Sequence, residues 1–343
     1  MKFRSIYFNA LLILAYFRRF NSFAENISPT KINLFHLAWT TSAESFKCWR
    51  IYVILSIQRT YQDQPFTIYI HSNSLNDQIL AKCSEHDKII TSSINYLPIN
   101  YKIFKDTPMY DWWNQHKEFH NAELPALKDD FRYSHLTDIV RFAVLWRYGG
   151  TYLDFDMLLL RPLGVFRNSF AAQKDDKDEL TKDDSDPYNF AFAIFEPQHP
   201  FLLEVMGNIS RVYDPKLWPC VGPRLITSGV NEWSSRNLVE FHKELPMEAI
   251  SNTSTSVHVF PHIYFYPLYW KFGASLVQRN ESSKREFNRL ISSAVTLHIW
   301  SRSTNMSTIE KGSTLHMLLN YIRENSRRKG ASLKSRKKID LIF

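Results

Sequence analysis

The segment "TDIVRFAVLWRYGGTYLDFDMLLL" (Thr137–Leu160) carries the strongest structural signal in this chain. Apolar residues recur through its first half at the spacing of a helix that packs broadly against a core. The pair Gly149–Gly150 predicts the end of that helix, because a left-handed glycine commonly follows the last helical turn. The second half, Thr151–Leu160, predicts a buried strand that Pro162 would end. A helix that turns directly into a buried strand is typical of an α/β fold.

Other segments extend the same pattern. Two strands are predicted at Ile32–Thr40 and Phe66–Ser72, with an amphipathic helix between them. This succession predicts a parallel βαβ unit. A further buried strand is expected at Tyr188–Pro197, and either Ser134 or Thr137 is expected to cap the central helix. Because no repeat or linker divides the chain, we predict one α/β domain with a mostly parallel, Rossmann-like sheet flanked by helices.

The composition limits the class of protein. The length of 343 residues and the hydrophobic content of 44% suit one large α/β domain or two small ones. The formal charge is +8, but the basic residues are concentrated in residues 1–19 and 323–343. The body of the chain therefore lacks a basic face, which argues against binding of nucleic acid. Residues 323–343 are interpreted as a basic C-terminal tail, either solvated or in contact with a polyanion such as anionic lipid.

The N-terminus has the pattern of a targeting segment. A short cationic start precedes the apolar run Ile6–Phe17, which is shorter than the roughly 20 residues of a usual membrane span. Residues 1–30 therefore predict either a signal peptide, cleaved near Ala24, or a short signal anchor, followed by a stem. Several N-x-S/T sequons agree with entry into the secretory lumen. The catalytic domain is expected to span residues 31–322.

Two acids end the predicted strand. Asp154 and Asp156 flank one residue, so on a strand their side chains share a face, at the carboxyl end where open parallel sheets bind ligands. Two such carboxylates repel each other and favour a cation, for which oxygen ligands suit Mn²⁺ or Mg²⁺. The alternative is a strand end that enters a loop. On the preceding helix, Asp138 and Arg141 share a face, either as a surface ion pair or as contacts to sugar hydroxyls and phosphate.

This block resembles the motif S/T-D-x-x-R-x-x-x-L-x-x-x-G-G-x-Y-x-D-x-D of the α-1,4-galactosyltransferase and α-1,4-N-acetylglucosaminyltransferase family, the D-x-D sugar-binding glycosyltransferases of glycosyltransferase family 32. Further segments resemble the family in the same order along the chain, from about Phe35 to Trp300. They are "FHLAWT", "FKDTPMYDWW", "YNFAFAIFE", "GPRLIT", "YFYPLYW" and "LHIW".

The resemblance implies a retaining transferase of the GT-A fold. Such an enzyme would move Gal, GalNAc or GlcNAc from a UDP-sugar to a terminal sugar of a glycolipid or glycan, forming an α-1,4 linkage. It implies Mn²⁺ (or Mg²⁺) as cofactor and a Golgi membrane protein, held by its N-terminus, with a lumenal catalytic domain. If the signal is cleaved, the domain would lie in the secretory lumen. The alternatives are a mannosyl- or glucosyltransferase of the same fold, and an inactive lumenal carbohydrate-binding protein.

The resemblance also assigns residues to roles. The implied metal ligands are Asp154, Asp156 and His298. The implied donor-binding residues are Trp39, Thr40, Asp138, Arg141, Gly150, Tyr152 and Asp154. The implied catalytic residues are Asn189 and Asp156, the implied acceptor-binding residues are Gly222 and Pro223, and the implied disulfide joins Cys48 to Cys83.

Some of these roles have alternatives. His298 could instead be a packed strand histidine, and Asn189 a polar strand start without a role. Phe190 stands where the family has glycine, so it is expected to crowd the sugar pocket.

Overall fold

The computed structural model describes residues 33–84, 91–120, 131–174, 186–250 and 255–326. The predicted signal or anchor segment (1–30) and most of the predicted basic tail (323–343) lie outside these residues. The last described helix runs to Ser326 and so crosses the domain boundary expected at residue 322. Among the described helices, none has the length and apolar character that a bilayer crossing needs.

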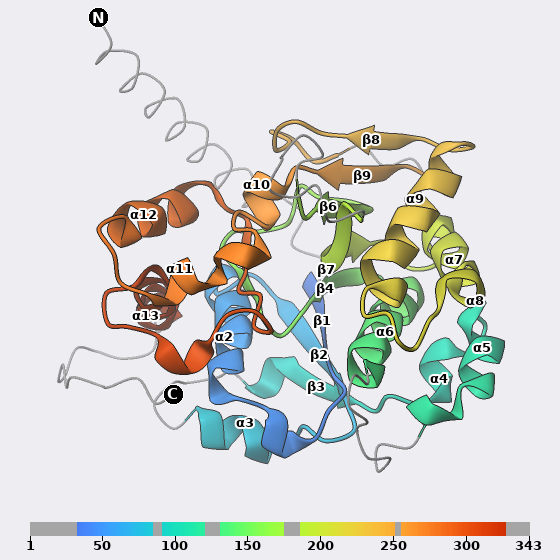
Figure 1. Cartoon of the computed structure of the whole chain (residues 1–343), viewed down its shortest axis with the longest axis horizontal. Coiled ribbons are helices and arrows are strands. Elements are labelled where there is room, and N and C mark those ends of the chain that lie inside the picture. Colours follow the sequence, from blue (N-terminus) through green and yellow to red (C-terminus); the bar gives the residue numbers. More distant parts are fainter. Residues whose placement is uncertain (1–32, 85–90, 121–130, 175–185, 251–254, 327–343) are drawn as a thin grey trace, which may run out of the picture.

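The strands form one large and one small sheet in the described part of the chain (Figure 1). The large sheet contains β1 (Asn33–Trp39), β2 (Phe66–Ser72), β3 (Ile94–Leu97), β4 (Gly150–Leu153), β6 (Ser169–Ala172), β7 (Tyr188–Phe195), β8 (Val239–Phe241) and β9 (Val257–Phe260). The small sheet pairs β5 (Met157–Leu159) with β10 (Thr296–His298).

The large sheet has the order β3-β2-β1-β4-β7-β6-β9-β8. β1 pairs in parallel with β2 over its whole length and with β4 on its other side. Only β7 runs antiparallel to both of its neighbours, β4 and β6, in this part of the chain. The prediction of an α/β domain with a mostly parallel, Rossmann-like sheet is confirmed.

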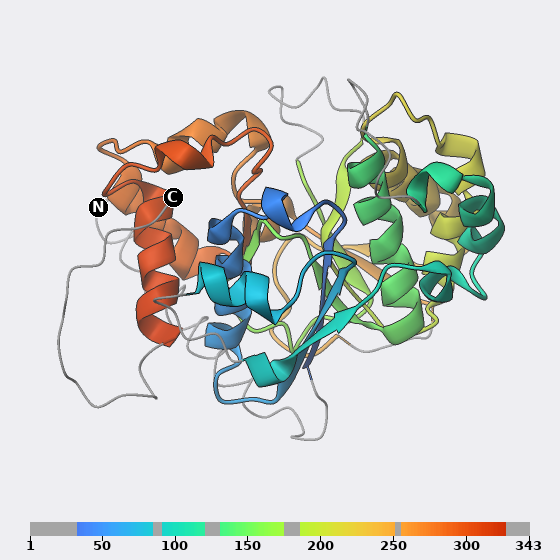
Figure 2. The same cartoon turned by 90° about the horizontal axis from the view of Figure 1, so that it is seen from below.

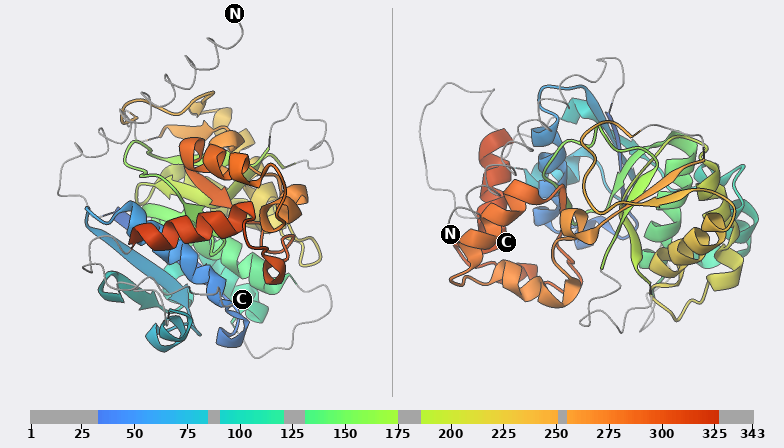
Figure 3. Two further views of the ribbon diagram at one scale, coloured as in Figure 1. Left: turned by 90° about the vertical axis from the view of Figure 1, so that its left-hand side faces the viewer. Right: turned by 90° about the horizontal axis from the view of Figure 1, so that it is seen from above.

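Helices cover both faces of this sheet (Figures 1 and 2). They are α2 (Ile51–Thr60), α3 (Asp77–Cys83), α4 (Tyr101–Phe104), α5 (Met109–Gln115), α6 (Arg132–Tyr148), α7 (Pro200–Gly207), α8 (Ile209–Val212), α9 (Leu225–Ser234), α10 (His262–Phe265), α11 (Gly273–Val277), α12 (Ser283–Ser293) and α13 (Thr314–Ser326). On one side α2 packs against β5 of the small sheet and shares a hydrophobic cluster with β1 and β2, and α13 packs on α2 (Figure 3). On the other side α6 packs against β1 and against α7, which in turn packs on α9.

The central helix begins and ends for different reasons. Its end is as predicted, since Gly149 has φ +63° and its N–H bonds the Leu145 carbonyl at 2.9 Å. A Cβ on Gly149 would lie 2.6 Å from the Pro197 ring, so the position needs glycine for space as well as for φ. The predicted start is wrong, because α6 begins at Arg132. The Thr137 hydroxyl donates to a carbonyl inside the helix and caps nothing.

The prediction of one continuous strand over Thr151–Leu160 is also wrong. β4 ends at Leu153 and β5 begins at Met157. Between them the chain makes a tight turn, in which the Met157 N–H donates to the Asp154 carbonyl at 2.9 Å. We call residues 154–156 the acidic turn. The turn allows β5 to leave the large sheet and pair with β10.

A disulfide ties the first helices together. Cys48 precedes α2 and Cys83 ends α3, and the structure joins them with their Cα atoms 4.8 Å apart. This is the pairing that the resemblance implied. Cys220 is a free thiol and is buried.

Two histidines form a buried pair beneath α6. His36 and His71 are both completely buried, with His36 Nδ1 2.9 Å from His71 Nε2. The other nitrogen of His36, Nε2, lies 2.9 Å from the Gly149 carbonyl. Because a carbonyl only accepts, His36 donates from Nε2, and His71 donates its Nε2–H to His36. Burial lowers the pKa of His36 to about 4, although the bond to Gly149 opposes the shift.

Acidification is therefore expected to destabilise the fold through this pair. The pKa of His36 is about 4 in the fold, against 6.5 as its ordinary value, so the unfolded chain binds the proton more readily. The stabilisation is fully present above about pH 6.5 and is lost as the pH falls toward about 4. His36 alone should lower the free energy of unfolding by about 2 kcal/mol at about pH 5, compared with its value above about pH 6.5.

Denaturant unfolding at about pH 7.5 and about pH 5 measures this loss in the wild type and in His36→Gln. The variant should lose less stability between the two pH values, whatever its stability at neutral pH. An equal loss in both proteins would contradict the assignment.

Candidate functional site

Three side chains that the sequence separates widely meet at the acidic turn. One ligand atom from each of Asp154, Asp156 and His298 lies within 4.8 Å of the others. His298 ends β10, whose pairing with β5 places it opposite Met157. The Ile299 N–H also donates to the Asp156 carbonyl at 2.8 Å. The small sheet is thus what brings the histidine to the two acids.

Asp156 is held from two directions. Its Oδ1 lies 3.1 Å from His298 Nε2, and its Oδ2 accepts the Ser301 N–H at 2.9 Å. Although burial would raise the pKa of Asp156, the charge and hydrogen bond of His298, the charge of Arg50 and the bond from Ser301 lower it well below its usual range. Asp156 therefore remains a carboxylate at any physiological pH.

The backbone after β10 is bent to reach Asp156. Trp300 has φ +55°, a left-handed conformation that is uncommon outside glycine. Its indole N–H donates to the Leu268 carbonyl at 2.6 Å, and its ring lies 3.9 Å from that of His298. Such strain persists where the surroundings impose it. Here it turns the Ser301 N–H toward the carboxylate.

Asp154 is held from the opposite side. It accepts from one guanidinium nitrogen of Arg141 at 3.1 Å and from the Tyr152 hydroxyl at 2.9 Å. Tyr152 is fully buried, and its ring lies 5.2 Å from the Arg141 guanidinium carbon. The structure therefore places Tyr152 beneath Asp154, where it orients the carboxylate.

Arg141 connects the acidic turn to α6. The same nitrogen that contacts Asp154 lies 2.6 Å from Asp138, one helical turn away, and Arg141 is only 4% exposed. Although burial lowers the pKa of Arg141, the carboxylates of Asp138 and Asp154 raise it above its ordinary value. Burial raises the pKa of Asp138 to about 7, against the effect of Arg141 and with that of Asp154. The surface ion pair weighed for Asp138 and Arg141 is therefore wrong.

The predicted acceptor segment lies against this pair. A Cβ on Gly222 would meet the Asp138 Oδ2 atom at 2.7 Å, and both Gly222 and Pro223 are buried. The segment Cys220–Arg224 thus passes directly beside the α6 carboxylate before α9 begins. Only a residue without a side chain allows this approach.

Gly222→Ala is expected to displace Asp138 and to weaken donor binding about 10-fold. A new methyl group in this packed site should also cost about 1–3 kcal/mol of folding. Gly207→Ala is the matched control, because a Cβ on Gly207 would meet nothing within 4 Å. That change at the end of α7 should be neutral or slightly stabilising. Thermal unfolding and nucleotide binding measure both, and equal behaviour of the two variants would contradict the contact.

Arg50 is a functional candidate that the sequence interpretation missed. Its guanidinium donates to the Phe155 carbonyl and to the Ser301 hydroxyl, both at 3.4 Å. Burial lowers the pKa of Arg50, while the carboxylates of Asp156 and Asp154 raise it. Its Nε is buried with no hydrogen-bond partner within the described residues. A cation so close to the acidic turn is placed to contact a phosphate.

The signal for Arg50 was present but weak. Its guanidinium lies over the rings of Trp39 and Trp49, 4.8 and 4.5 Å from their centroids. Residues 48–50 form a tight turn that the Cys48 disulfide anchors. The apolar periodicity places Arg50 in an amphipathic helix, whereas the two residues before it are a bridged cysteine and a tryptophan.

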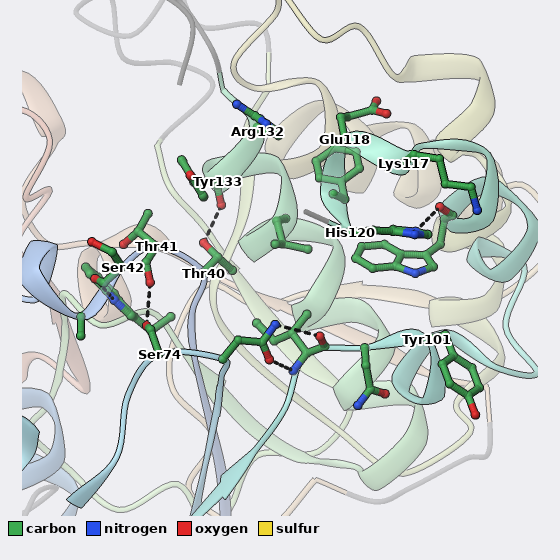
Figure 4. Close-up of a pocket in the computed structure, with 18 of the residues that line it drawn as sticks. Thr40, Thr41, Ser42, Ser74, Tyr101, Lys117, Glu118, His120, Arg132 and Tyr133 are labelled. Atoms are coloured by element: carbon green, nitrogen blue, oxygen red, sulfur yellow. Dashed lines mark hydrogen bonds between the residues drawn. The ribbon is translucent and has the colours of Figure 1, made fainter. Parts of the chain in front are cut away.

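A cavity of about 790 Å³ opens at the same edge of the sheet (Figure 4). Its lining comes from the carboxyl ends of β1, β2 and β3, including Thr40, Ser74 and Asn100, and from the start of α6. Thr40 donates to the Tyr133 carbonyl at 2.9 Å. Since β4 is parallel to these strands, the acidic turn that follows it lies at this edge too. Trp39 lies between the cavity and the acidic turn, because it lines the cavity and packs edge-on against Phe155.

Three other predicted residues are placed differently. Gly150 lies at the opposite end of β4 from Asp154, where a Cβ would meet the Leu34 carbonyl at 2.7 Å, so its role there is in packing. Asn189 starts β7, and its amide is engaged with Gln173 at 3.0 Å and with the Ala191 N–H at 2.8 Å. Phe190 is fully buried in the core beside α6, so the expectation that it crowds a sugar pocket is wrong.

Two family models match the chain in succession. The glycosyltransferase sugar-binding region containing the DXD motif matches residues 52–177, and the α-1,4-glycosyltransferase conserved region matches residues 194–325. The first contains the acidic turn and Arg141, and the second contains Gly222 and His298. This chain belongs to the DXD α-1,4-glycosyltransferases. The predicted family is confirmed.

Relatives of this chain share 26–33% identity with it over part of its length. Lactosylceramide 4-alpha-galactosyltransferase of Homo sapiens is 26% identical over 223 residues, which are 64% of this chain and 55% of that protein. Alpha-1,4-N-acetylglucosaminyltransferase of Homo sapiens is 33% identical over 138 residues, 40% of this chain and 35% of that protein. The chain thus spans about half the length of the galactosyltransferase it matches.

Among solved structures, an active-site mutant of LgtC is similar, with a TM-score of 0.43 and 10% identity. The similarity covers 84% of this chain and 95% of that one.

Proposed function

We propose that this chain is a retaining glycosyltransferase that uses a UDP-sugar and a divalent cation. It would move galactose, N-acetylgalactosamine or N-acetylglucosamine to a terminal sugar of a glycolipid or glycan, through an α-1,4 linkage. The observation that carries the proposal is the meeting of Asp154, Asp156 and His298 beside the buried Arg141. The proposed Golgi membrane location, with the domain in the lumen, rests on the predicted N-terminal segment and on what the family resemblance implies.

The three side chains fit a cation such as Mn²⁺ or Mg²⁺. They supply carboxylate oxygens and one imidazole, and Asp154 and Asp156 remain 20% and 13% exposed, so their free lone pairs reach solvent. Two carboxylates this close need a positive charge between them. A cation there would neutralise the negative charge that develops on the diphosphate as the bond between the donor sugar and the diphosphate breaks.

The remaining residues would hold the donor around that point. Arg141 fixes Asp154, and its partner Asp138 accepts hydrogen bonds from sugar hydroxyls. Arg50 contacts the diphosphate from the other side of the turn. Trp39 and Thr40 place the nucleoside at the mouth of the cavity, where Trp39 already packs beside the acidic turn.

Acceptor and catalytic roles follow from position. Gly222 lies against Asp138 and Pro223 follows it in the chain, so an acceptor sugar bound at these residues would be next to the donor sugar. Asn189 orients the donor from the start of β7, while its own amide is held by Gln173.

Calorimetric titration of the purified chain with a panel of UDP-sugars tests the proposal. One UDP-sugar should bind with Mn²⁺ present and lose binding when a chelator is added. The product of transfer to lactose-terminated lipid, analysed by NMR, should carry an α-1,4 linkage. A folded chain that binds no UDP-sugar would overturn the transferase and favour the carbohydrate-binding alternative.

A further inference from the structure

A second group of metal-ligating side chains lies far from the acidic turn, at the β8 edge of the large sheet (Figure 1). Glu240 is on β8, and its partner across the ladder is His258 on β9. The His242 N–H donates to the Val259 carbonyl at 2.9 Å, so the ladder continues past the end of β8. Residues two apart on a strand share a face, which puts Glu240, His242 and His258 on one side of this edge.

The three ligand atoms have the separations that a tetrahedral ion requires. His242 Nε2 and His258 Nδ1 are 3.0 Å apart. The Glu240 carboxylate oxygen lies 3.4 Å from His258 Nδ1 and 3.8 Å from His242 Nε2. Metal bonds of about 2.0–2.1 Å at tetrahedral angles place ligands about 3.3 Å apart. An ion slightly out of the plane of these three atoms, on the side open to water, would need only small side-chain movements.

We propose that Glu240, His242 and His258 form a Zn²⁺ site that holds the edge strand β8 in register with β9. The donor set of two imidazoles and one carboxylate is one that Zn²⁺ uses, with water as the fourth ligand. The acidic turn has two carboxylates and one imidazole and suits a harder ion. The two sites therefore differ in the metal they prefer.

The three side chains are preorganised, and the site is accessible to an ion from solvent. His258 is only 1% exposed, and its Nδ1, the nitrogen that faces the other two side chains, lies 3.0 Å from His242 Nε2 and 3.4 Å from the Glu240 carboxylate. The His242 ring stacks on Phe260, with ring centres 4.5 Å apart and planes at 16°. The Glu240 side chain is 42% exposed, which leaves an open side for the ion to enter and for a water ligand.

The proposed role is structural. β8 has three residues and forms the outer edge of the sheet, with β9 as its neighbour. So short a strand gains little from its own ladder, and an ion shared between β8 and β9 would hold it in register. This inference does not depend on the proposed transferase activity.

Zinc binding is tested on the full chain, purified without a polyhistidine tag and stripped of metal. An Asp156→Asn background removes the acidic turn as a competing site. Equilibrium dialysis against Zn²⁺ should show one bound equivalent in this background, and thermal unfolding should shift upward with Zn²⁺. His242→Gln and Glu240→Gln should each weaken Zn²⁺ binding roughly 10-fold or more.

His316→Gln is the control, since His316 is a half-buried histidine on α13, outside both clusters. It should retain the bound equivalent. Glu240→Gln changes an exposed side chain and so should fold even if His242→Gln does not. The proposal is overturned if the Asp156→Asn chain binds no Zn²⁺, or if Zn²⁺ binding survives Glu240→Gln unchanged.

Discussion

Asp156→Asn is expected to abolish metal-dependent UDP-sugar binding and to lower the transfer rate by roughly 10²–10³-fold. Asparagine keeps the shape of the side chain and can still accept the Ser301 N–H, which Asp156 accepts at 2.9 Å. It removes the negative charge that faces His298 and Arg50. The fold should survive with reduced stability, because the change creates no cavity and keeps the Ser301 bond, while His298 and Arg50 lose the negative charge that they face.

The measurement is calorimetric titration with the UDP-sugar and Mn²⁺, beside thermal unfolding of the same samples. Glu286→Gln is the matched control, because Glu286 is a carboxylate on α12 that pairs with Arg289 one turn away. The control should bind as the wild type does. Mn²⁺-dependent binding that persists in Asp156→Asn would remove Asp156 from the metal ligands.

The sequence correctly predicted the strands that position the site and the end of the central helix. β2 was predicted at its observed bounds, and β1 within one residue at each end, because both are buried runs with polar flanks. The parallel pairing followed from the βαβ succession. The pair Gly149–Gly150 was predicted to end α6 with a left-handed residue, and Gly149 is the one that does so.

The acidic turn itself could not be predicted from the local pattern. Residues 151–160 are apolar on both sides of the two acids, so periodicity favours a single strand. What breaks that strand is a distant partner, β10, which pairs with β5 in a separate sheet. The two acids still face His298, but a turn rather than strand alternation puts them there. Phe155 is buried beside Trp39 and Phe46, so it does point away from them.

The polar contacts were the least predictable part. Arg50 and Ser301 reach the acidic turn from segments that are 251 residues apart in sequence. Neither residue type is unusual at its position, and only the folded chain shows that both face Asp156. The same holds for Glu240, His242 and His258, whose common face depends on the β8–β9 register.

Arg141→Ala is expected to cost about 3–5 kcal/mol of folding free energy, in addition to donor binding. Arg141 is 4% exposed and contacts both Asp138 and Asp154 through one nitrogen. Its removal leaves two mostly buried carboxylates with no cation between them. Burial already raises the pKa of Asp138 to about 7 with Arg141 present, which shows how little solvation this carboxylate retains.

Arg211→Ala is the matched control for this loss. Arg211 is also paired with a carboxylate, Glu232, at 2.6 Å, but its side chain is 62% exposed. An exposed ion pair contributes about 0–1 kcal/mol, so the two arginines should differ several-fold in denaturant unfolding. Arg141→Lys should recover part of the stability but little donor binding, because an ammonium does not reproduce the planar guanidinium, which lies over the Tyr152 ring while one of its nitrogens contacts both carboxylates. If Arg141→Ala and Arg211→Ala lost the same amount of stability, the Arg141–Asp138 ion pair would be solvated. It could then not hold the donor-binding side chains in fixed positions.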